Sequence, residues 1–305
     1  MLSEFYFEWE ASLILAFQSV LGRSGTAVMS LVTEFGGEAV LFLILGVIYW
    51  GYDKELGEKI GLNLLTSIVL CLILKNCLLR LRPYFIVPGV KCLKPVEAGD
   101  IMDVTIQGYS FPSSHSGSAA SVYGTIAFYS GKRSVRILCA LITAAVGISR
   151  FCLGVHFPTD VIAGILIGTA LILITEYARK KNVSRKVLYG FIMGCGAVGM
   201  FFCTTEDYYT AYGVLVGGLC GLLYEQNRVR FRNTASLSVA LLRTAGGIAA
   251  FLLVSLVLKT VFNTLELAGT AQLLIRTLRY AASAFIAVGV YPSVFRFEKT
   301  SDNSR

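Results

Sequence analysis

Charged residues are scarce in this sequence, where they make up 15% of 305 residues against 55% for hydrophobic residues. In a soluble globular domain about a quarter of the residues are charged, so this composition excludes that class. Apolar runs long enough to cross a bilayer recur along the chain, and they lack the alternation of barrel strands. The sequence therefore predicts an all-α fold, a polytopic bundle of transmembrane helices.

Acidic residues are the rarer charged type, with 19 Asp and Glu against 27 Lys and Arg and a net charge of +8. A basic excess can indicate nucleic-acid binding, but here the basic residues form short clusters between apolar runs. Such clusters are typical of the loops that set the topology of a membrane protein. We therefore expect the bilayer, and no nucleic acid, as a partner.

Histidine is nearly absent, since the chain holds only His115 and His156. The eight cysteines lack the spacing of metal ligands, and no carboxylate cluster accompanies the histidines. The sequence thus predicts neither a metal site nor another cofactor. Cys92 and Cys203 are the two cysteines that could lie near an oxidising face, and a disulfide between them is left open.

Nine apolar segments are predicted to span the membrane. Residues 1–35 precede them as an interfacial segment, because Arg23 interrupts the apolar pattern before it could cross ~30 Å of hydrocarbon. The predicted spans are approximately residues 36–50, 60–79, 114–129, 135–152, 160–177, 187–203, 211–224, 237–258 and 271–290.

Charge in the loops predicts the orientation of these spans. One side carries the basic clusters, and the other carries Glu206 and Asp207. Because Lys and Arg are enriched in cytoplasmic loops, the basic side is predicted to be cytoplasmic, as is the C-terminus. The N-terminus, both histidines and the long loop of residues 80–111 are then extracytoplasmic. The basic clusters are Lys132, Arg133 and Arg136; Arg179, Lys180, Lys181, Arg185 and Lys186; and Arg228, Arg230 and Arg232.

Each histidine opens an apolar run beside other polar residues. His156 and Asp160 are four residues apart, so on a helix the carboxylate could hold one imidazole nitrogen protonated. The other nitrogen could then act as a base, a metal ligand or a nucleophile, while Arg150 suits phosphate or carboxylate. Taken alone, this stretch fits an ordinary loop with a surface salt bridge equally well. Lys75 and Arg82 at the same predicted face favour function.

Three short motifs contain these residues: Lys75, six residues, Arg82-Pro83; Pro112-Ser113-Ser114-His115; and Ser149-Arg150, five residues, His156, three residues, Asp160. Their order and spacing resemble the three-part signature of the type 2 phosphatidic acid phosphatase superfamily. Ser114 stands where the commonest form has glycine, and small hydroxyl variants are similar to the dolichyl-diphosphate and sphingosine-phosphate branches. Nine spans with an outer N-terminus also resemble the glucose-6-phosphatase arrangement.

The resemblance implies a catalytic core in residues 36–180 and additional helices in residues 181–305. It implies that His156 attacks phosphorus to form a phosphohistidine, that Asp160 orients His156, and that His115 protonates the leaving group. The expected substrate is a lipid phosphate monoester or diphosphate of phosphatidate, sphingoid-base or polyprenyl type, hydrolysed without a metal at the extracytoplasmic face. The phosphoryl oxygens would be bound by Lys75, Arg82, Ser113, Ser114 and Arg150.

Other functions are also considered. A transporter or channel predicts polar residues along several spans and an internal repeat, whereas here polar side chains concentrate at one end of a few helices. The exceptions are Arg243, Arg276 and Arg279. They could contact lipid headgroups or a partner, and we prefer to interpret them as snorkelling to the interface. A haloperoxidase that uses vanadate shares the signature, but those enzymes are soluble. A soluble sugar phosphate stays an alternative substrate, and the oligomeric state is not indicated.

Overall fold

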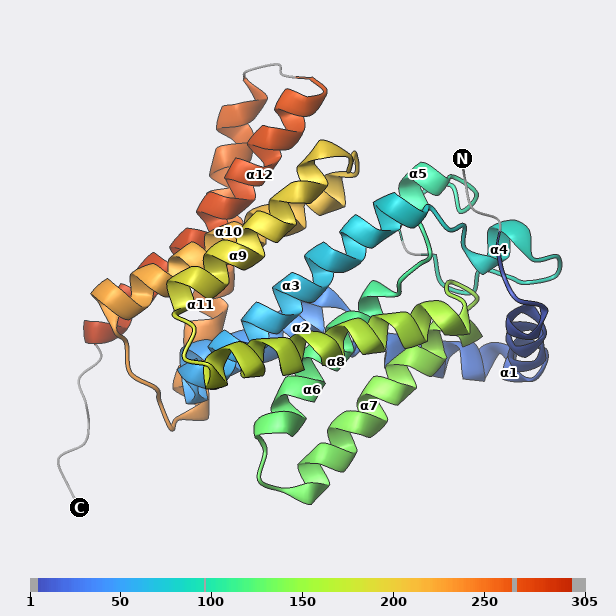
Figure 1. Cartoon of the computed structure of the whole chain (residues 1–305), viewed down its shortest axis with the longest axis horizontal. Helices are drawn as coiled ribbons and strands as arrows, with labels where there is room; N and C mark the ends of the chain where they lie inside the picture. The colour runs from blue at the N-terminus through green and yellow to red at the C-terminus, as the bar shows by residue number, and fades with distance from the viewer. Residues whose placement is uncertain (1–4, 96, 265–267, 298–305) are drawn as a thin grey trace. The chain divides into compact units, whose positions relative to one another are not determined.

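The structure, a computed structural model, describes residues 5–95, 97–264 and 268–297, and its regular elements in those ranges are helical, without strands (Figure 1). This confirms the predicted all-α fold. The α-helices are α1 (Glu8–Glu34), α2 (Glu38–Gly46), α3 (Lys54–Leu78), α4 (Pro83–Ile86), α5 (Val104–Gln107), α6 (Ser114–Tyr129), α7 (Arg133–Cys152), α8 (Pro158–Lys180), α9 (Arg185–Ala197), α10 (Glu206–Tyr224), α11 (Leu237–Asn263) and α12 (Thr270–Phe285). Short π and 3-10 segments are η1 (Val47–Tyr52), η2 (Val198–Phe201), η3 (Glu225–Val229), η4 (Ile286–Val290) and η5 (Tyr291–Phe297).

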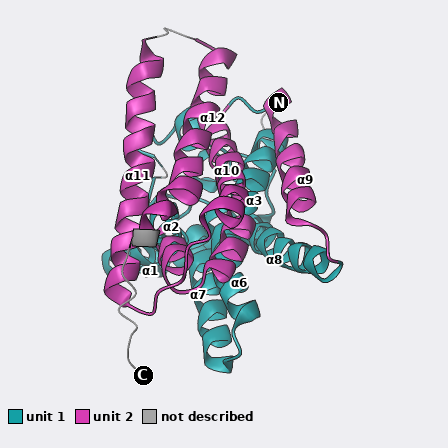
Figure 2. Ribbon diagram, turned by 90° about the vertical axis from the view of Figure 1, so that its left-hand side faces the viewer, with its two compact units in different colours: residues 1–42, 66–181, 202–204 teal, residues 43–65, 182–201, 205–305 magenta. Residues whose placement is uncertain are grey.

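The chain forms two compact units that are described separately (Figure 2). Unit 1 comprises residues 1–42, 66–181 and 202–204, and unit 2 comprises residues 43–65, 182–201 and 205–305. Unit 1 contains every residue that the sequence places in the site. The sequence predicts a different division, into residues 1–35, 36–180 and 181–305. That division stays a prediction.

Five helices are long and apolar enough to cross a membrane, and there are six spans if α1 and the α2–η1 segment count as one broken span. These numbers refer to the described residues. The prediction of nine spans is not confirmed. Predicted segment 114–129 coincides with α6, but its 16 residues rise only about 24 Å. The five long helices are Lys54–Leu78, Arg133–Cys152, Pro158–Lys180, Leu237–Asn263 and Thr270–Phe295.

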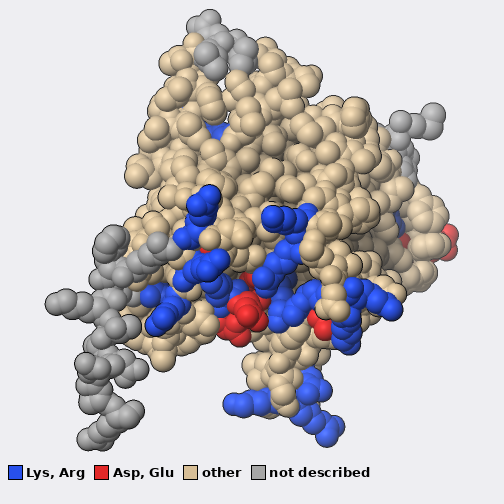
Figure 3. All heavy atoms as spheres, turned by 60° about the vertical axis from the view of Figure 1, so that its left-hand side comes forward, with Lys and Arg blue, Asp and Glu red and all other residues tan. Residues whose placement is uncertain are grey.

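The helix surfaces suit contact with lipid. Large areas of the face shown in Figure 3 carry no charged side chain. On α11, Leu242 is 70% exposed and Leu253 is 63% exposed, although burial of such side chains is normally favourable. A bilayer would cover these side chains. The chain is therefore an integral membrane protein.

Helix α1 continues past Arg23, where the apolar pattern is interrupted. The helix breaks at the preceding residue, Gly22, whose φ of 54° and ψ of −177° lie outside the helical region. A positive φ is readily adopted by glycine, which lacks a Cβ. After Gly22 the helix resumes and ends at Glu34.

In unit 1, α6 packs against α7 and α8, and α1 packs against α7. Small residues allow the approach of α6 and α8: a Cβ at Gly164 would lie 2.4 Å from the carbonyl oxygen of Ser113. Close helix packing through small residues is common in membranes. It brings the start of α6 against α8, and the Ser113 amide donates to the Asp160 carbonyl at 3.0 Å. The helix packing thus aligns two parts of the signature.

All eight cysteines are free, including Cys92 and Cys203. Both of these residues lie in the described ranges, and no disulfide joins them there. The structure thus does not form the bond that the sequence left open. Cys203 is buried in unit 1.

Candidate active site

His156 lies in the short connection between α7 and α8 and is 2% exposed. Pro158 begins α8, and Asp160 in its first turn accepts a hydrogen bond from the Phe157 amide at 2.8 Å. The Asp160 carboxylate is thereby fixed with Oδ2 3.5 Å from His156 Nδ1. The carboxylate and the imidazole thus face each other as predicted, although His156 precedes the helix, and their separation is at the long end of hydrogen-bond range.

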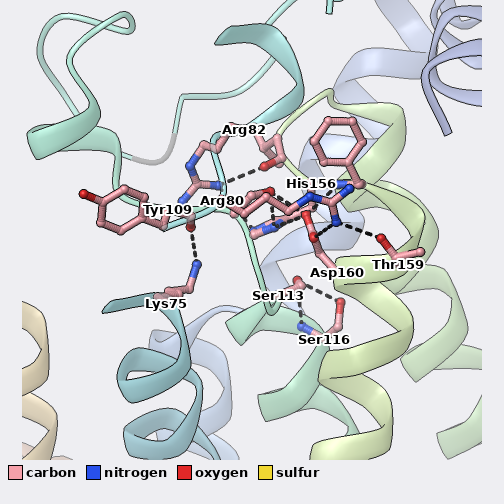
Figure 4. A network of polar contacts seen from close by, with 12 residues as sticks. Lys75, Arg80, Arg82, Tyr109, Ser113, Ser116, His156, Thr159 and Asp160 are labelled. Atoms are coloured by element: carbon pink, nitrogen blue, oxygen red, sulfur yellow. Dashed lines mark hydrogen bonds and ion pairs between the residues drawn. The ribbon is translucent and has the colours of Figure 1, made fainter. Parts of the chain in front are cut away.

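Ser110 lies between these two groups. Its hydroxyl donates to Asp160 Oδ2 and lies 3.4 Å from His156 Nδ1. One side of the imidazole ring is thus occupied by a carboxylate and a hydroxyl. The other ring nitrogen, Nε2, faces Arg82 Nη1 at 3.3 Å (Figure 4).

Arg82 is 3% exposed and is held by backbone carbonyls. Its Nε donates to the carbonyls of Gln107 and Gly108 at 3.0 Å, and Nη1 donates to that of Val155 at 2.9 Å. These contacts come from the long loop and from the connection that holds His156. The loop therefore fixes the guanidinium beside the imidazole.

Lys75 and Arg150 supply two further buried cations. Lys75 Nζ, at the end of α3, donates to the Tyr109 carbonyl at 2.5 Å. Arg150 Nη1, at the end of α7, donates to Thr33 Oγ1 at 2.7 Å, while its Nε is buried without a partner among the described residues. Burial and the positive charges of Arg82, Lys75 and Arg150 lower the pKa of His156 well below its usual value of 6.5. These effects favour the neutral form of the imidazole.

The second part of the signature forms the start of α6. Ser113 is its N-cap, and its hydroxyl accepts hydrogen bonds from the amide of Ser116 at 3.4 Å and the hydroxyl of Ser116 at 3.0 Å. Ser114 and His115 follow in the first turn, and the Ser114 hydroxyl is buried without a partner among the described residues. A helix N-terminus attracts anions through its free amides and dipole.

Sequence reasoning missed Arg80, which organises the carboxylate side of the site. Arg80 Nη1 contacts Asp160 Oδ1 at 2.6 Å and Thr159 Oγ1 at 2.8 Å, and Nη2 contacts Glu10 Oε2 at 2.8 Å. Its guanidinium carbon also lies 4.2 Å from the centre of the Phe157 ring. Arg80 is 5% exposed, and both carboxylates are fully buried. Figure 4 shows Arg80 and Arg82 reaching Asp160 and His156 respectively.

Glu10 was interpreted as part of an interfacial helix, yet α1 brings it into this network. One carboxylate oxygen accepts the Thr159 amide at 3.0 Å, and the other pairs with Arg80. A carboxylate in an apolar segment is costly unless it is paired, and that cost is a sequence signal for a buried partner. The sequence does not say which cation is the partner.

No group of three or more His, Cys, Asp or Glu side chains suited to a metal ion occurs in the described part of the chain. The described residues therefore contain no cluster of metal ligands near the site. The cations close to His156 are side chains of the protein: Lys75, Arg82 and Arg150.

Two stretches match known families. Residues 59–184 match the PAP2 superfamily, and residues 209–302 match the PAP2 superfamily phosphatase transmembrane extension. The first match contains all eight site residues expected from the sequence. The second covers most of the additional C-terminal helices.

Two curated proteins are similar in sequence. Phosphatidylglycerophosphatase B of Bacillus subtilis is 32% identical over 162 residues, which are 49% of this chain and 72% of that protein. Undecaprenyl-diphosphatase of Sulfolobus acidocaldarius is 33% identical over 116 residues, 37% of this chain and 52% of that protein. Among solved structures, LpxE of Aquifex aeolicus has a similar fold, with a TM-score of 0.50 and 24% identity. That likeness covers 58% of this chain and 99% of LpxE.

Proposed function

Because the chain belongs to the PAP2 superfamily, we propose that it is a membrane phosphatase that hydrolyses a lipid phosphate monoester or diphosphate through a phosphohistidine. The observation that carries this proposal is the arrangement of His156. Its Nδ1 faces Asp160 and Ser110, which leaves Nε2 as the nitrogen on the side of Arg82. A neutral imidazole held in this way is a suitable nucleophile.

In the first step, His156 Nε2 forms a bond to phosphorus while the bond from phosphorus to the leaving oxygen breaks. His115, which begins this step as the imidazolium, gives its proton to that oxygen. In the second step, water attacks the phosphohistidine, His115 takes a proton from the water, and the bond from nitrogen to phosphorus breaks. Phosphate leaves and both histidines return to their initial states.

The transition state carries negative charge on its equatorial oxygens. Lys75, Arg82 and Arg150 would bind these oxygens, assisted by Ser113 and Ser114 at the start of α6. Preorganised cations and amides stabilise developing charge without the reorganisation that water requires. We therefore propose a hydrolase that is independent of metal ions.

A lipid substrate is proposed because the site lies at the ends of membrane helices and because the two similar curated proteins are named for lipid phosphates. Family membership also favours hydrolysis over the transporter alternative. Experiment must decide between a monophosphate and a diphosphate substrate. It must also decide between a lipid and a soluble sugar phosphate.

A panel of substrates tests the proposal, with phosphate release measured on purified protein in detergent. Phosphatidylglycerol phosphate, phosphatidate, sphingosine phosphate, a polyprenyl diphosphate and a hexose phosphate should be compared with and without a chelator. We expect turnover of at least one lipid that chelator leaves intact, and its loss in His156→Ala but not in the exposed control Lys186→Gln. Turnover of the hexose phosphate alone, or an absolute need for added magnesium, would contradict the proposal.

A further inference from the structure

Unit 2 contains a cationic pocket, which we call the α11–α12 pocket. It has a volume of about 200 Å³, and its lining residues come from the start of α10, the end of α11 and the first turns of α12. Its charged lining residues are Lys259, Arg276, Arg279 and Glu206. Since a water molecule occupies about 30 Å³ of liquid, the pocket has room for roughly six waters, or for one phosphoryl group.

Two of these cations lie inside a candidate membrane span. Arg276 and Arg279 are the seventh and tenth residues of the helix Thr270–Phe295, about 9 to 14 Å along its axis. Arginine within a membrane helix is costly, and such residues commonly mark a functional site. The orientation predicted from loop charge also puts this end outside, where Lys and Arg are normally sparse.

Only part of this positive charge is balanced by the described lining residues. Arg276 Nη1 pairs with Glu206 Oε2 at 2.5 Å, and Arg276 Nε donates to Thr210 Oγ1 at 2.7 Å. The four charged lining residues therefore sum to +2, from three cations and one carboxylate. Among the described lining residues, positive charge is therefore in excess, and an anion would neutralise it.

Arg279 gives an independent indication of a ligand. Its guanidinium carbon lies 4.6 Å from the centre of the Tyr280 ring, which fixes the plane of the group. Its Nε is buried and has no hydrogen-bond partner among the described residues. A buried donor without an acceptor is unfavourable, and an anionic oxygen in the pocket would supply one.

The flanks of the pocket are apolar. Phe262, Leu273 and Ile275 are among its lining residues, and Leu256, one turn before Lys259 on α11, is 60% exposed. A ligand with an anionic head and hydrocarbon chains would match both the cations and these apolar side chains. We propose that the α11–α12 pocket binds the phosphate headgroup of an anionic phospholipid, with the acyl chains along α11 and α12. This proposal does not depend on the phosphatase reaction, because its residues lie outside the proposed catalytic site.

Native mass spectrometry of the full chain in detergent tests the proposal. The protein is titrated with phosphatidylglycerol or with phosphatidylcholine of the same acyl chains. We expect preferential binding of phosphatidylglycerol, weakened roughly fivefold by Arg279→Gln and by Lys259→Gln, as expected for the loss of one cation near a lipid phosphate. Arg133→Gln and Lys186→Gln remove equal charge at exposed positions elsewhere and should leave binding within twofold.

Two further arms separate the possible causes. Arg279→Lys keeps the charge and should bind more phosphatidylglycerol than Arg279→Gln does; equal losses in the two variants would overturn recognition by charge. Soluble glycerol phosphate should not displace the lipid at equal concentration, and displacement would show that a free phosphate is the ligand. Equal binding of the two lipids, or unchanged binding in both pocket variants, would also overturn the proposal.

Discussion

Arg80 joins two buried carboxylates, Asp160 at 2.6 Å and Glu10 at 2.8 Å. When one partner of a buried ion pair is removed, the remaining charge is uncompensated, at a typical cost of about 3–5 kcal/mol. We therefore expect Arg80→Gln to lower both the unfolding temperature and turnover, because Asp160 loses a contact that fixes it beside His156. Thermal unfolding in detergent and phosphate release measure the two effects.

A double-mutant cycle supplies the control for this prediction. Glu10→Gln alone should also destabilise the protein, because Arg80 then loses one of its two carboxylates. The double variant Arg80→Gln/Glu10→Gln should be more stable than the sum of the single effects implies, since it leaves neither of these charges unpaired. Strictly additive changes in the free energy of unfolding would show that the two side chains do not depend on each other.

The protonation of His156 gives a second prediction. Burial and three neighbouring cations disfavour the imidazolium form, so its pKa lies well below 6.5. In His115→Gln, His156 is the only histidine of the chain, and its ring signals can be followed by NMR after labelling of histidine. We expect a titration midpoint below 6.5, with the neutral nucleophile present above it and lost as pH falls through it. A midpoint at or above 6.5 would falsify this account.

The residues found from the sequence and those missed differ in one physical respect. His156, Asp160, Lys75 and Arg82 occur in short motifs whose spacing is visible along the chain. Arg80 meets Glu10 across 70 residues of sequence and Asp160 across 80, and its partners follow from helix packing. Motif spacing therefore predicts site residues that lie close together in the sequence. Buried ion pairs between helices can be recognised only once the fold is known.

At the scale of helices, the contact of α6 with α8 decides whether the site is assembled. Gly164→Ala would place a Cβ 2.4 Å from the Ser113 carbonyl oxygen, so the two helices must separate. Because the Ser113 amide donates to the Asp160 carbonyl, separation would move the start of α6 away from α8. We expect a lower unfolding temperature and a large loss of turnover.

Gly190→Ala is the matched control for Gly164→Ala. Gly190 lies on α9, and a Cβ there would meet nothing within 4 Å. Alanine is favoured over glycine in a helix by about 1 kcal/mol, so this variant should keep full activity and be no less stable. If both alanine variants behave alike, close packing at Gly164 is not what assembles the site.

The lengths of the apolar runs predict where the helices lie. They do not predict where a helix is interrupted. The predicted segment 160–177 lies within α8, and segment 237–258 lies within α11. The sequence shows an interruption of the apolar pattern at Arg23 but not the break of the helix at Gly22, because a charge is visible in a hydropathy pattern and a positive φ is not. Burial of Glu10 was missed for a similar reason, since it depends on what α1 packs against.

For the whole molecule, membrane insertion and family follow from the sequence more firmly than the number of spans. Composition predicts a polytopic helical protein, and the five long apolar helices agree with that prediction. The count of nine rests on shorter segments such as 187–203, where α9 has 13 residues and is followed by a 3-10 turn. Hydropathy alone does not determine whether such segments cross the bilayer or pack within it.

The charge of the loops predicts the orientation of the chain in the membrane. Five basic residues surround the junction of α8 and α9: two end α8, one lies between the helices and two begin α9. Lys and Arg near span ends favour the cytoplasm. We expect the long loop, and with it the proposed active site, to be extracytoplasmic. In a cysteine-free background, Lys91→Cys should react with an impermeant maleimide in intact cells, whereas Lys180→Cys should react only after permeabilisation. Both positions are exposed in the structure, so access to the reagent differs only through the membrane. Labelling of Lys180→Cys in intact cells, without labelling of Lys91→Cys, would reverse the topology and place the proposed phosphatase site in the cytoplasm.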